Sequence, residues 1–313
     1  MKNEKTGENL MSKSTTGHKP VLLKESIEGL EIKPGDVFFD GTLGSAGHSE
    51  KVCKLYGKEV RIIGTDLDED ALIRATEKLE KNNCNFSVHH FNYRNLDKVL
   101  EELGIEEVDK ILLDLGISSD QLEVSGRGFS FQKNEPLLMT MKKEITENDL
   151  TAKEIVNTWD EENIADIIYG YGEEKFSRSI AKKIFEARKE KPIETTFELV
   201  EIVKSAVPSF YRRGRINPAT KTFQALRITV NDEMEGLKEA LLKGFNHLKK
   251  GGRMAVISFH SLEDRLVKNF YKEKKELGFA KLINKKPMIP SEEEIRENGR
   301  SRSSKLRILE KII

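Results

Sequence analysis

Short apolar segments alternate with segments of helical periodicity from Lys33 to Leu115, and this alternation constrains the fold more than any other feature. Runs rich in apolar and β-branched residues predict four strands, over residues 37–39, 61–65, 86–88 and 108–115. Helical spacing predicts helices between them, over residues 48–56, 68–82 and 96–103. The fourth strand is almost continuously apolar, as is typical of a parallel strand buried on both faces. We therefore predict an α/β fold with a Rossmann-like parallel sheet.

Strand signals are then nearly absent until residues 253–258, where a further strand is expected after a helix that ends at Gly251-Gly252. The intervening segment carries helix signals instead. T-x-x-E capping boxes begin at Thr151 and Thr195, and Asn217-Pro218 fits an N-cap followed by proline. One face of a long helix is marked by Phe176, Ile180, Ile184 and Ala187.

This pattern predicts a sheet domain that is interrupted by an inserted all-helical domain of ordinary size. The sheet core is expected over residues 18–121 and 222–313, and the helical insertion over residues 122–221. The polar segment 1–17 is expected to be a disordered tail.

The composition, 37% hydrophobic and 34% charged, is typical of a globular protein. Its 53 basic and 53 acidic residues cancel, which disfavours a generic polycation but not a local basic patch. Cys53 and Cys84 have no CxxC spacing, so two free thiols in a reducing compartment are expected rather than a disulfide or a metal pair. No apolar run approaches the ~20 residues of a membrane span. We expect a cytoplasmic protein with no membrane partner and no metal cluster.

A glycine-rich loop, Asp40 to His48, follows the first expected strand. Glycines at this place let the backbone approach a ligand closely. Gly41, Gly44 and Gly47 are spaced G-x-x-G-x-x-G, which differs from the G-x-G-x-x-G of a pyrophosphate site, and no P-loop lysine follows. The spacing therefore disfavours a nicotinamide-dependent dehydrogenase and a nucleoside triphosphatase.

Acidic residues end three of the expected strands: Asp40, Asp66 and Asp114. Asp66 stands where a carboxylate accepts both hydroxyls of an adenosine ribose, and Asp114 lies at the carboxyl edge, where α/β sheets bind ligands. Single acids at such places are often helix caps. Three together suit a sulfonium and amino-acid cofactor better than a diphosphate, so the loop is predicted to bind S-adenosylmethionine.

Seven segments resemble the MraW/RsmH methyltransferase family, in family order over about residues 18–313. They are HKPVLLKE (18–25), DGTLGSAGHS (40–49), ILLDLGISS (111–119), RGFSF (127–131), NPATKTFQALR (217–227), SFHSLEDR (258–265) and SSKLR (303–307). The resemblance implies methylation of the exocyclic N4 of one cytidine in the decoding region of bacterial 16S ribosomal RNA. It makes the small ribosomal subunit the expected partner. The sequence leaves a homodimer open.

The resemblance also implies roles for individual residues. The methionine part of the cofactor would lie against Ala46, Gly47 and His48, with Asp66 at the ribose and Phe91 near the adenine. Asp114 and Gln121 would complete the pocket, in which Asp40 organises the loop. Read without the family, Phe91 is as well explained as a core aromatic.

The chemistry follows from the substrate, because a cytosine amine is conjugated with its ring and is a poor nucleophile. The enzyme must hold the amine in line with the methyl group and accept its N–H groups. Candidate catalytic residues are Asp114, Ser118, Ser119 and His260, with Asp114 preferred as the polar anchor. His260 is equally well explained as a structural histidine bonded to backbone.

Two groups of basic residues are candidate RNA contacts. Arg212, Arg213 and Arg215 lie beside Tyr211, an aromatic residue that could stack on a base. The second group has no intervening acid in the sequence and comprises Arg300, Arg302, Lys305 and Arg307.

The chain departs from the family pattern in two places. Asp120 replaces the proline that follows the Ser-Ser pair, and 136–142 reads PLLMTMK where the family has P-L-D-M-R-M-D. The charge changes fall at Leu138, Thr140 and Lys142. A catalytically weakened paralogue that acts as an RNA-binding assembly factor, or that methylates another RNA site, is therefore the alternative function.

Overall fold

The computed structural model describes residues 19–117, 122 and 125–313. The expected tail and the candidate residues Ser118, Ser119 and Gln121 lie outside these described residues.

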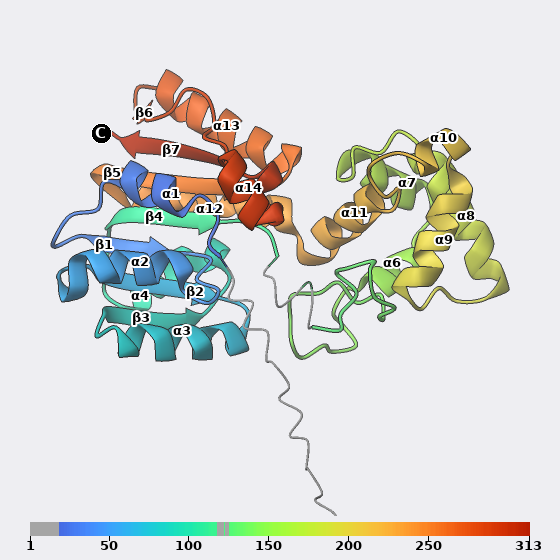
Figure 1. The fold of residues 1–313 in the computed structure, drawn as a ribbon, viewed down its shortest axis with the longest axis horizontal. Coiled ribbons are helices and arrows are strands. Elements are labelled where there is room, and N and C mark those ends of the chain that lie inside the picture. Colours follow the sequence, from blue (N-terminus) through green and yellow to red (C-terminus); the bar gives the residue numbers. More distant parts are fainter. Residues whose placement is uncertain (1–18, 118–121, 123–124) are drawn as a thin grey trace, which may run out of the picture.

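A seven-stranded sheet of order β3-β2-β1-β4-β5-β7-β6 forms one half of the described chain (Figure 1). Strands β1 to β5 are parallel, whereas β7 is antiparallel to both β5 and β6. The strands are β1 (Val37–Asp40), β2 (Arg61–Asp66), β3 (Asn85–His90), β4 (Val108–Asp114), β5 (Leu248–Ser258), β6 (Ala280–Leu282) and β7 (Lys305–Lys311). The predicted α/β fold with a Rossmann-like sheet is confirmed, and β6 and β7 are additions to it.

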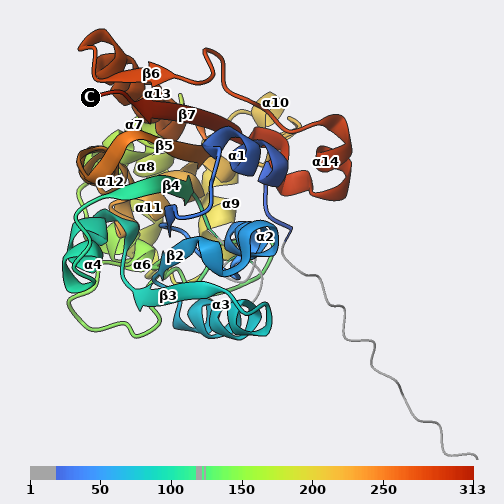
Figure 2. The same cartoon turned by 90° about the vertical axis from the view of Figure 1, so that its left-hand side faces the viewer.

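Helices cover both faces of the sheet (Figure 2). One layer holds α1 (Leu23–Leu30), α2 (Gly47–Tyr56) and α3 (Glu69–Lys81). The other layer holds α4 (Leu96–Glu102), α12 (Glu233–His247) and α13 (Ser261–Glu276). The short helix α14 (Glu292–Glu297) lies outside these layers, near α1.

Neighbouring residues of the central strands point into opposite layers. Phe38 packs with the α1–α2 cluster and Phe39 with the α4–α12 cluster, and Leu112 and Leu113 of β4 divide in the same way. Since successive strand side chains alternate between faces, both must be apolar when both faces are covered. This explains the nearly continuous apolar runs that predicted these strands.

The second half of the described chain is helical and joins the sheet between β4 and β5 (Figure 1). Its helices are α6 (Ala152–Thr158), α7 (Glu161–Gly170), α8 (Ser177–Glu190), α9 (Thr196–Ala206), α10 (Ser209–Arg212) and α11 (Thr220–Asn231). Their apolar faces share one buried cluster. The capping box predicted at Thr195 is confirmed, whereas at Thr151 only the threonine side chain accepts the backbone N–H three residues on.

Two predicted helix boundaries are wrong. Helix α11 begins at Thr220, because Asn217 Oδ1 accepts the Ala219 N–H in a turn before the helix. Helix α12 ends at His247, and the expected helix end at Gly251-Gly252 lies inside β5, where Gly251 has a φ of 78° and the register with β4 shifts.

The expected domain junction at residues 221–222 falls inside α11. Phe223 and Leu226 of this helix are buried in the same cluster as α6 to α9. We therefore propose that the inserted helical unit extends to Asn231.

The expectation of two free thiols is wrong, because Cys53 and Cys84 form a disulfide with a Cα–Cα distance of 5.6 Å. Cys53 lies on α2 and Cys84 in the turn between α3 and β3. The two cysteines are 31 residues apart in the sequence, and packing of α2 beside α3 brings them together. No cysteine spacing motif indicates this pairing. None of the described helices is both long and apolar enough to cross a membrane.

Candidate active site

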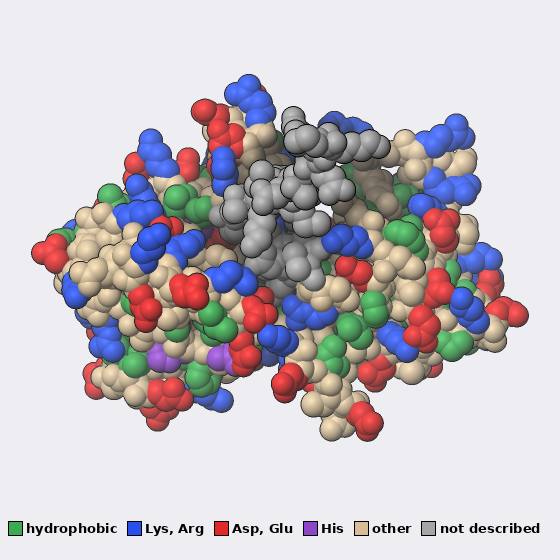
Figure 3. All heavy atoms as spheres, turned by 60° about the horizontal axis from the view of Figure 1, so that its bottom comes forward, with side chains coloured by type: hydrophobic (Ala, Val, Ile, Leu, Met, Phe, Trp, Pro, Cys, Tyr) green, Lys and Arg blue, Asp and Glu red, His purple; other side chains and the backbone are tan. Residues whose placement is uncertain are grey.

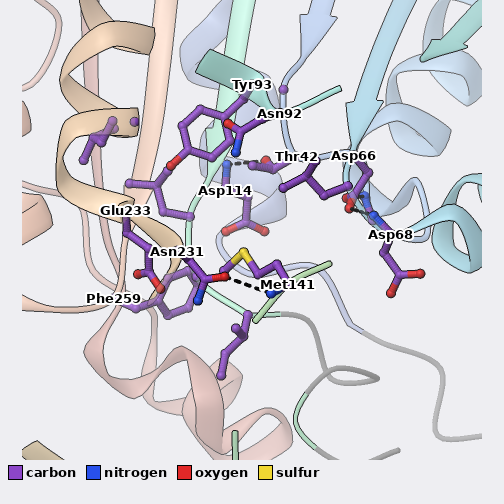
Figure 4. Close-up of a pocket in the computed structure, with 18 of the residues that line it drawn as sticks. Thr42, Asp66, Asp68, Asn92, Tyr93, Asp114, Met141, Asn231, Glu233 and Phe259 are labelled. Carbon is purple, nitrogen blue, oxygen red and sulfur yellow. Dashed lines mark hydrogen bonds between the residues drawn. The ribbon is translucent and has the colours of Figure 1, made fainter. Parts of the chain in front are cut away.

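A cavity opens at the carboxyl ends of β1, β2 and β4 (Figure 4). Strands β1 and β4 are neighbours, and the strand order reverses between them. Ligands of open α/β sheets bind at such a switch point. The cavity therefore lies where the sheet topology alone would place a ligand.

The loop after β1 forms one wall through Gly41, Thr42 and Gly44. A Cβ on Gly41 would lie 2.5 Å from Leu113 Cδ2, so a larger residue would press on the Leu113 side chain of β4. Gly44 has a φ of 49°, and its N–H donates to Asp66 Oδ2 at 2.8 Å. The glycine spacing thus serves a tight turn that is fastened to the end of β2.

Asp66 lines the cavity, as does Phe91. Besides the Gly44 bond, Asp66 Oδ1 accepts the Asp68 N–H at 2.9 Å. Burial raises the pKa of Asp66 even though these two hydrogen bonds lower it. The sequence predicted this position because Asp66 directly ends an apolar strand.

Asp40 lies behind the cavity wall and is 2% exposed. Its carboxylate accepts the Ser49 hydroxyl at 2.6 Å and the Thr42 N–H at 3.3 Å. Burial raises its pKa to about 6, against the lowering effect of these two bonds. Asp40 therefore shapes the loop from inside, which agrees with the organising role expected for it.

The other loop residues expected at the cofactor do not face the cavity. Ala46 and His48 are buried, and Gly47 packs on Pro20. His48 Nε2 lies 3.1 Å from the Val21 carbonyl oxygen, while Nδ1 is 3.9 Å from Asp114 Oδ2.

Asp114, at the end of β4, points into the cavity (Figure 4). Its backbone N–H donates to Thr42 Oγ1 at 2.6 Å. Its Oδ1 is buried and has no hydrogen-bond partner among the described residues. Burial, followed by the charges of Asp40, Glu263 and Glu294, raises the pKa of Asp114 well above its usual range. A buried oxygen of this kind is costly unless a ligand brings a donor or a cation to it.

The opposite wall includes Tyr93, Glu233, Phe259 and Glu263, none of which the sequence singled out (Figure 4). They come from three separate segments that meet only in the folded chain. Asn92 and Tyr93 belong to the β3–α4 connection, Glu233 starts α12, and Phe259 follows β5. Phe259 and Glu263 belong to a segment quoted for the family resemblance, SFHSLEDR (258–265), and no spacing links the other two to it.

His260 is the N-cap of α13. Its Nδ1 accepts the Glu263 N–H at 3.4 Å, and its buried Nε2 lies 3.1 Å from Glu263 Oε1 but makes no hydrogen bond among the described residues. Glu263 in turn accepts the backbone N–H groups of Phe259 and His260. Since His260 does not line the cavity, this capping arrangement favours the structural alternative over a catalytic role.

Glu233, His260 and Glu263 bring ligand-type atoms within 4.8 Å of one another. Both Glu233 oxygens are already bonded to the Arg227 guanidinium, at 2.8 and 2.9 Å. A guanidinium with two such bonds supplies the positive charge that these carboxylates need. The geometry is therefore that of a structural ion-pair network, and the absence of a metal stays a prediction.

The inserted unit contributes Met141 and Asn231 to the cavity (Figure 4). Asn231 Oδ1 accepts the Met141 N–H at 2.8 Å, and Nδ2 donates to the Met139 carbonyl at 2.7 Å. The three departures from the family pattern flank these contacts. Thr140 is buried, Lys142 forms an ion pair with Asp149, and Leu138 lines a second hollow.

Basic and acidic side chains are interspersed on the face shown in Figure 3. The surroundings of each basic side chain are therefore more informative about RNA binding than the net charge of this face. Arg212, Arg213 and Arg215 are exposed on and after α10. Tyr211, the aromatic residue predicted to stack on RNA, is half-buried. Its hydroxyl donates a hydrogen bond to Glu174 at 2.6 Å.

The second basic group is divided by the fold. Arg300 lines the cavity, and Arg302 is exposed beside the hollow next to His260. Lys305 and Arg307 pair with Asp264 of α13, at 3.1 and 2.7 Å. No acidic residue interrupts this group in the sequence, but the fold places Asp264 beside it. The inference that the group is free of acidic neighbours is therefore wrong.

The sequence is similar to known methyltransferases over almost its whole length. The sequence model of the MraW methylase family matches residues 15–312. A ribosomal RNA small subunit methyltransferase H from Lachnospira eligens is 44% identical over 312 residues, covering 94% of this chain and 98% of that protein. A protein of the same name from Sulfurihydrogenibium sp. is 47% identical over 291 residues, with coverages of 93% and 98%. A solved rRNA methylase from Streptococcus thermophilus is 12% identical, with a TM-score of 0.43 and coverages of 94% and 98%. The chain belongs to the MraW methylase family.

Proposed function

We propose that this chain transfers the methyl group of S-adenosylmethionine to the exocyclic N4 of a cytidine in the decoding region of 16S ribosomal RNA. Membership of a methylase family and the names of its relatives support small-subunit ribosomal RNA as the substrate. The structural observation that carries the proposal is the buried, unpartnered Oδ1 of Asp114 in the cavity.

The cavity fits the cofactor predicted from the sequence. Asp66 and Phe91 line it near the glycine loop, where a ribose and an adenine would lie. Asp114 adds a desolvated carboxylate, and a sulfonium or ammonium group offers such a carboxylate the positive charge that its surroundings lack. When bound, S-adenosylmethionine supplies an electrophilic methyl group.

Asp114 also suits the chemistry of a cytosine amine. Its Oδ1 can accept one amine N–H, which orients the nitrogen lone pair and raises electron density on nitrogen. Its raised pKa makes the carboxylate a suitable acceptor for the proton that the amine loses on methylation. The Thr42 bond fixes the backbone of Asp114, so the carboxylate is held in place before the substrate arrives.

The alternative, a weakened paralogue with an assembly role, is not favoured by identities of 44–47% over almost the whole chain. It remains distinguishable by experiment. Calorimetry would then show cofactor binding, while no methyl group would be transferred to small-subunit RNA or particles.

The proposal is tested in a strain that lacks this chain. Mass spectrometry of 16S fragments should show one methyl group lost from one decoding-region cytidine, and the wild-type gene should restore it. A gene carrying Asp114→Asn should restore much less. An unchanged 16S modification pattern in the deletion strain, with no second copy of the gene present, would refute the proposal.

A further inference from the structure

The helical unit carries a surface that the methyl-transfer site does not use. It consists of Lys175, Phe210, Arg212, Arg213 and Arg215, and is called the α10 surface below. All five side chains are exposed, and Phe210 is 67% exposed. An aromatic ring so open to solvent among cations is a typical feature of single-strand nucleic-acid sites.

The cations of the α10 surface have no carboxylate within ion-pair distance among the residues that the structure describes. The two acids that directly precede Lys175, Glu173 and Glu174, are engaged elsewhere. Glu174 is fully buried and accepts the Tyr211 hydroxyl, while Glu173 pairs with Arg265 of α13 at 2.6 Å. The surface therefore keeps its positive charge, although the whole chain is neutral.

Packing beneath the surface holds Tyr211 in place. Tyr211 packs edge-to-face on Phe176, with the ring centroids 5.0 Å apart. The Lys175 ammonium lies 5.5 Å from the Tyr211 ring and 6.0 Å from the Phe210 ring. Because Tyr211 is fixed from below, its neighbour Phe210 is directed outward with a cation beside its ring.

Contacts link the α10 surface to the wall of the cavity. Glu173, two residues before Lys175, bonds Ser261 and Arg265 at the start of α13. That helix begins just after Phe259, which lines the cavity. The start of α13 therefore contacts the segment that precedes Lys175 and directly follows the cavity wall.

We propose that the α10 surface binds unpaired nucleotides that flank the methylated one, with one base stacked on Phe210 and phosphates held by the arginines. The proposal rests on the proposed function, because it takes RNA as the substrate. Unpaired RNA is the expected partner because bases inside a duplex do not present a face to an aromatic ring. Phosphate contacts by the three arginines would be independent of base sequence.

The test compares Phe210→Ala with Phe197→Ala in the full chain. Phe197 is 45% exposed and begins α9, at the opposite end of that helix from α10. Binding is measured to an unstructured RNA oligonucleotide and to an RNA duplex of equal length. Loss of one base stack predicts about five- to hundredfold weaker binding of the single strand by Phe210→Ala, with duplex binding unchanged. Phe197→Ala should bind both as the unaltered chain does.

A second pair of variants, in which a positive charge is removed, distinguishes phosphate contacts from base stacking. Arg212→Gln should lower the salt dependence of single-strand binding, with the slope of log affinity against log salt falling by about 0.7. Lys183→Gln is the matched control, since Lys183 is exposed but already pairs with Glu186.

The proposal is overturned if Phe210→Ala binds the single strand normally, or if it loses single-strand and duplex binding equally. Methyl transfer by the unaltered chain is measured in parallel. If the unaltered chain transfers methyl groups but Phe210→Ala binds the single strand normally, only the α10 proposal is refuted. A Phe210 effect on binding without any transfer supports the α10 surface and refutes the proposed function.

Discussion

The Asp114 N–H donates to Thr42 Oγ1 at 2.6 Å, so the end of β4 is bonded directly to the glycine loop after β1. Both residues line the cavity. The bond joins the two strands that flank the switch point of the sheet, and it fixes the backbone that carries the carboxylate proposed to hold the substrate amine.

Thr42→Val should therefore weaken both stability and cofactor binding. It leaves the Asp114 N–H without its acceptor, which costs about 1–3 kcal/mol. Thr42→Ser retains the hydroxyl and should behave nearly as the unaltered chain. Denaturant unfolding and calorimetric titration with S-adenosylmethionine measure the two effects. Equal behaviour of the Val and Ser variants would show that the bond has no role.

Asp40 should make stability depend on pH. Its pKa of about 6 in the folded chain lies above the usual 3.8, so the folded state binds more protons between these values. Stability contributed by protonated Asp40 is therefore present below about pH 4 and is lost as the pH rises through about 6. Relative to Asp40→Asn, the free energy of unfolding should fall by about 2 kcal/mol between pH 4 and pH 7. A constant difference between the two proteins across this range would contradict the assignment.

Gly41→Ala should destabilise the chain, because the added Cβ would lie 2.5 Å from Leu113 Cδ2 in a fully packed wall. Overpacking of this kind costs about 1–3 kcal/mol. The control is Gly170→Ala at the end of α7, where no atom lies within 4 Å of an added Cβ. Thermal unfolding should show a lower midpoint for Gly41→Ala and an unchanged or higher one for Gly170→Ala. Equal midpoints would indicate that the wall can rearrange.

The Cys53–Cys84 disulfide should stabilise the sheet unit. A loop of this length predicts a contribution of about 3–4 kcal/mol. Reductant should lower the unfolding midpoint of the unaltered chain and leave the Cys53→Ser/Cys84→Ser double variant unaffected. The same midpoint with and without reductant in the unaltered chain would mean that the bond is not formed in solution.

Much of the sheet was predictable because burial on both faces leaves a strong pattern. Phe38-Phe39 and Leu112-Leu113 are apolar pairs whose members serve opposite layers, and such pairs stand out from the surrounding polar sequence. Strand β7 was missed for a related reason. Leu306 and Ile308 alternate with Lys305 and Arg307, and the charged residues suggest an RNA contact in the sequence, whereas in the strand they face Asp264 of α13.

The candidate site was predictable only where its residues end strands. Asp66 and Asp114 line the cavity as predicted, since carboxyl ends of parallel strands meet at one edge. Tyr93 and Glu233 were missed because they reach the cavity from connections and helix starts, whose packing leaves no period in the sequence. Tyr211 and Phe210 show the same limit, because sequence alone does not tell which of two adjacent aromatic residues is buried.

The central claim is that Asp114 holds a cytidine amine for methylation. The most direct measurement is transfer of tritiated methyl from S-adenosylmethionine to small ribosomal subunits purified from a strain lacking this chain, followed by nucleoside analysis. We predict label on cytidine N4 at one position, with transfer by Asp114→Asn and Asp114→Ala reduced at least about a hundredfold, as for loss of a positioned group in the transition state. Transfer by these variants at the unaltered rate, or label on a carbon atom or another base, would contradict it.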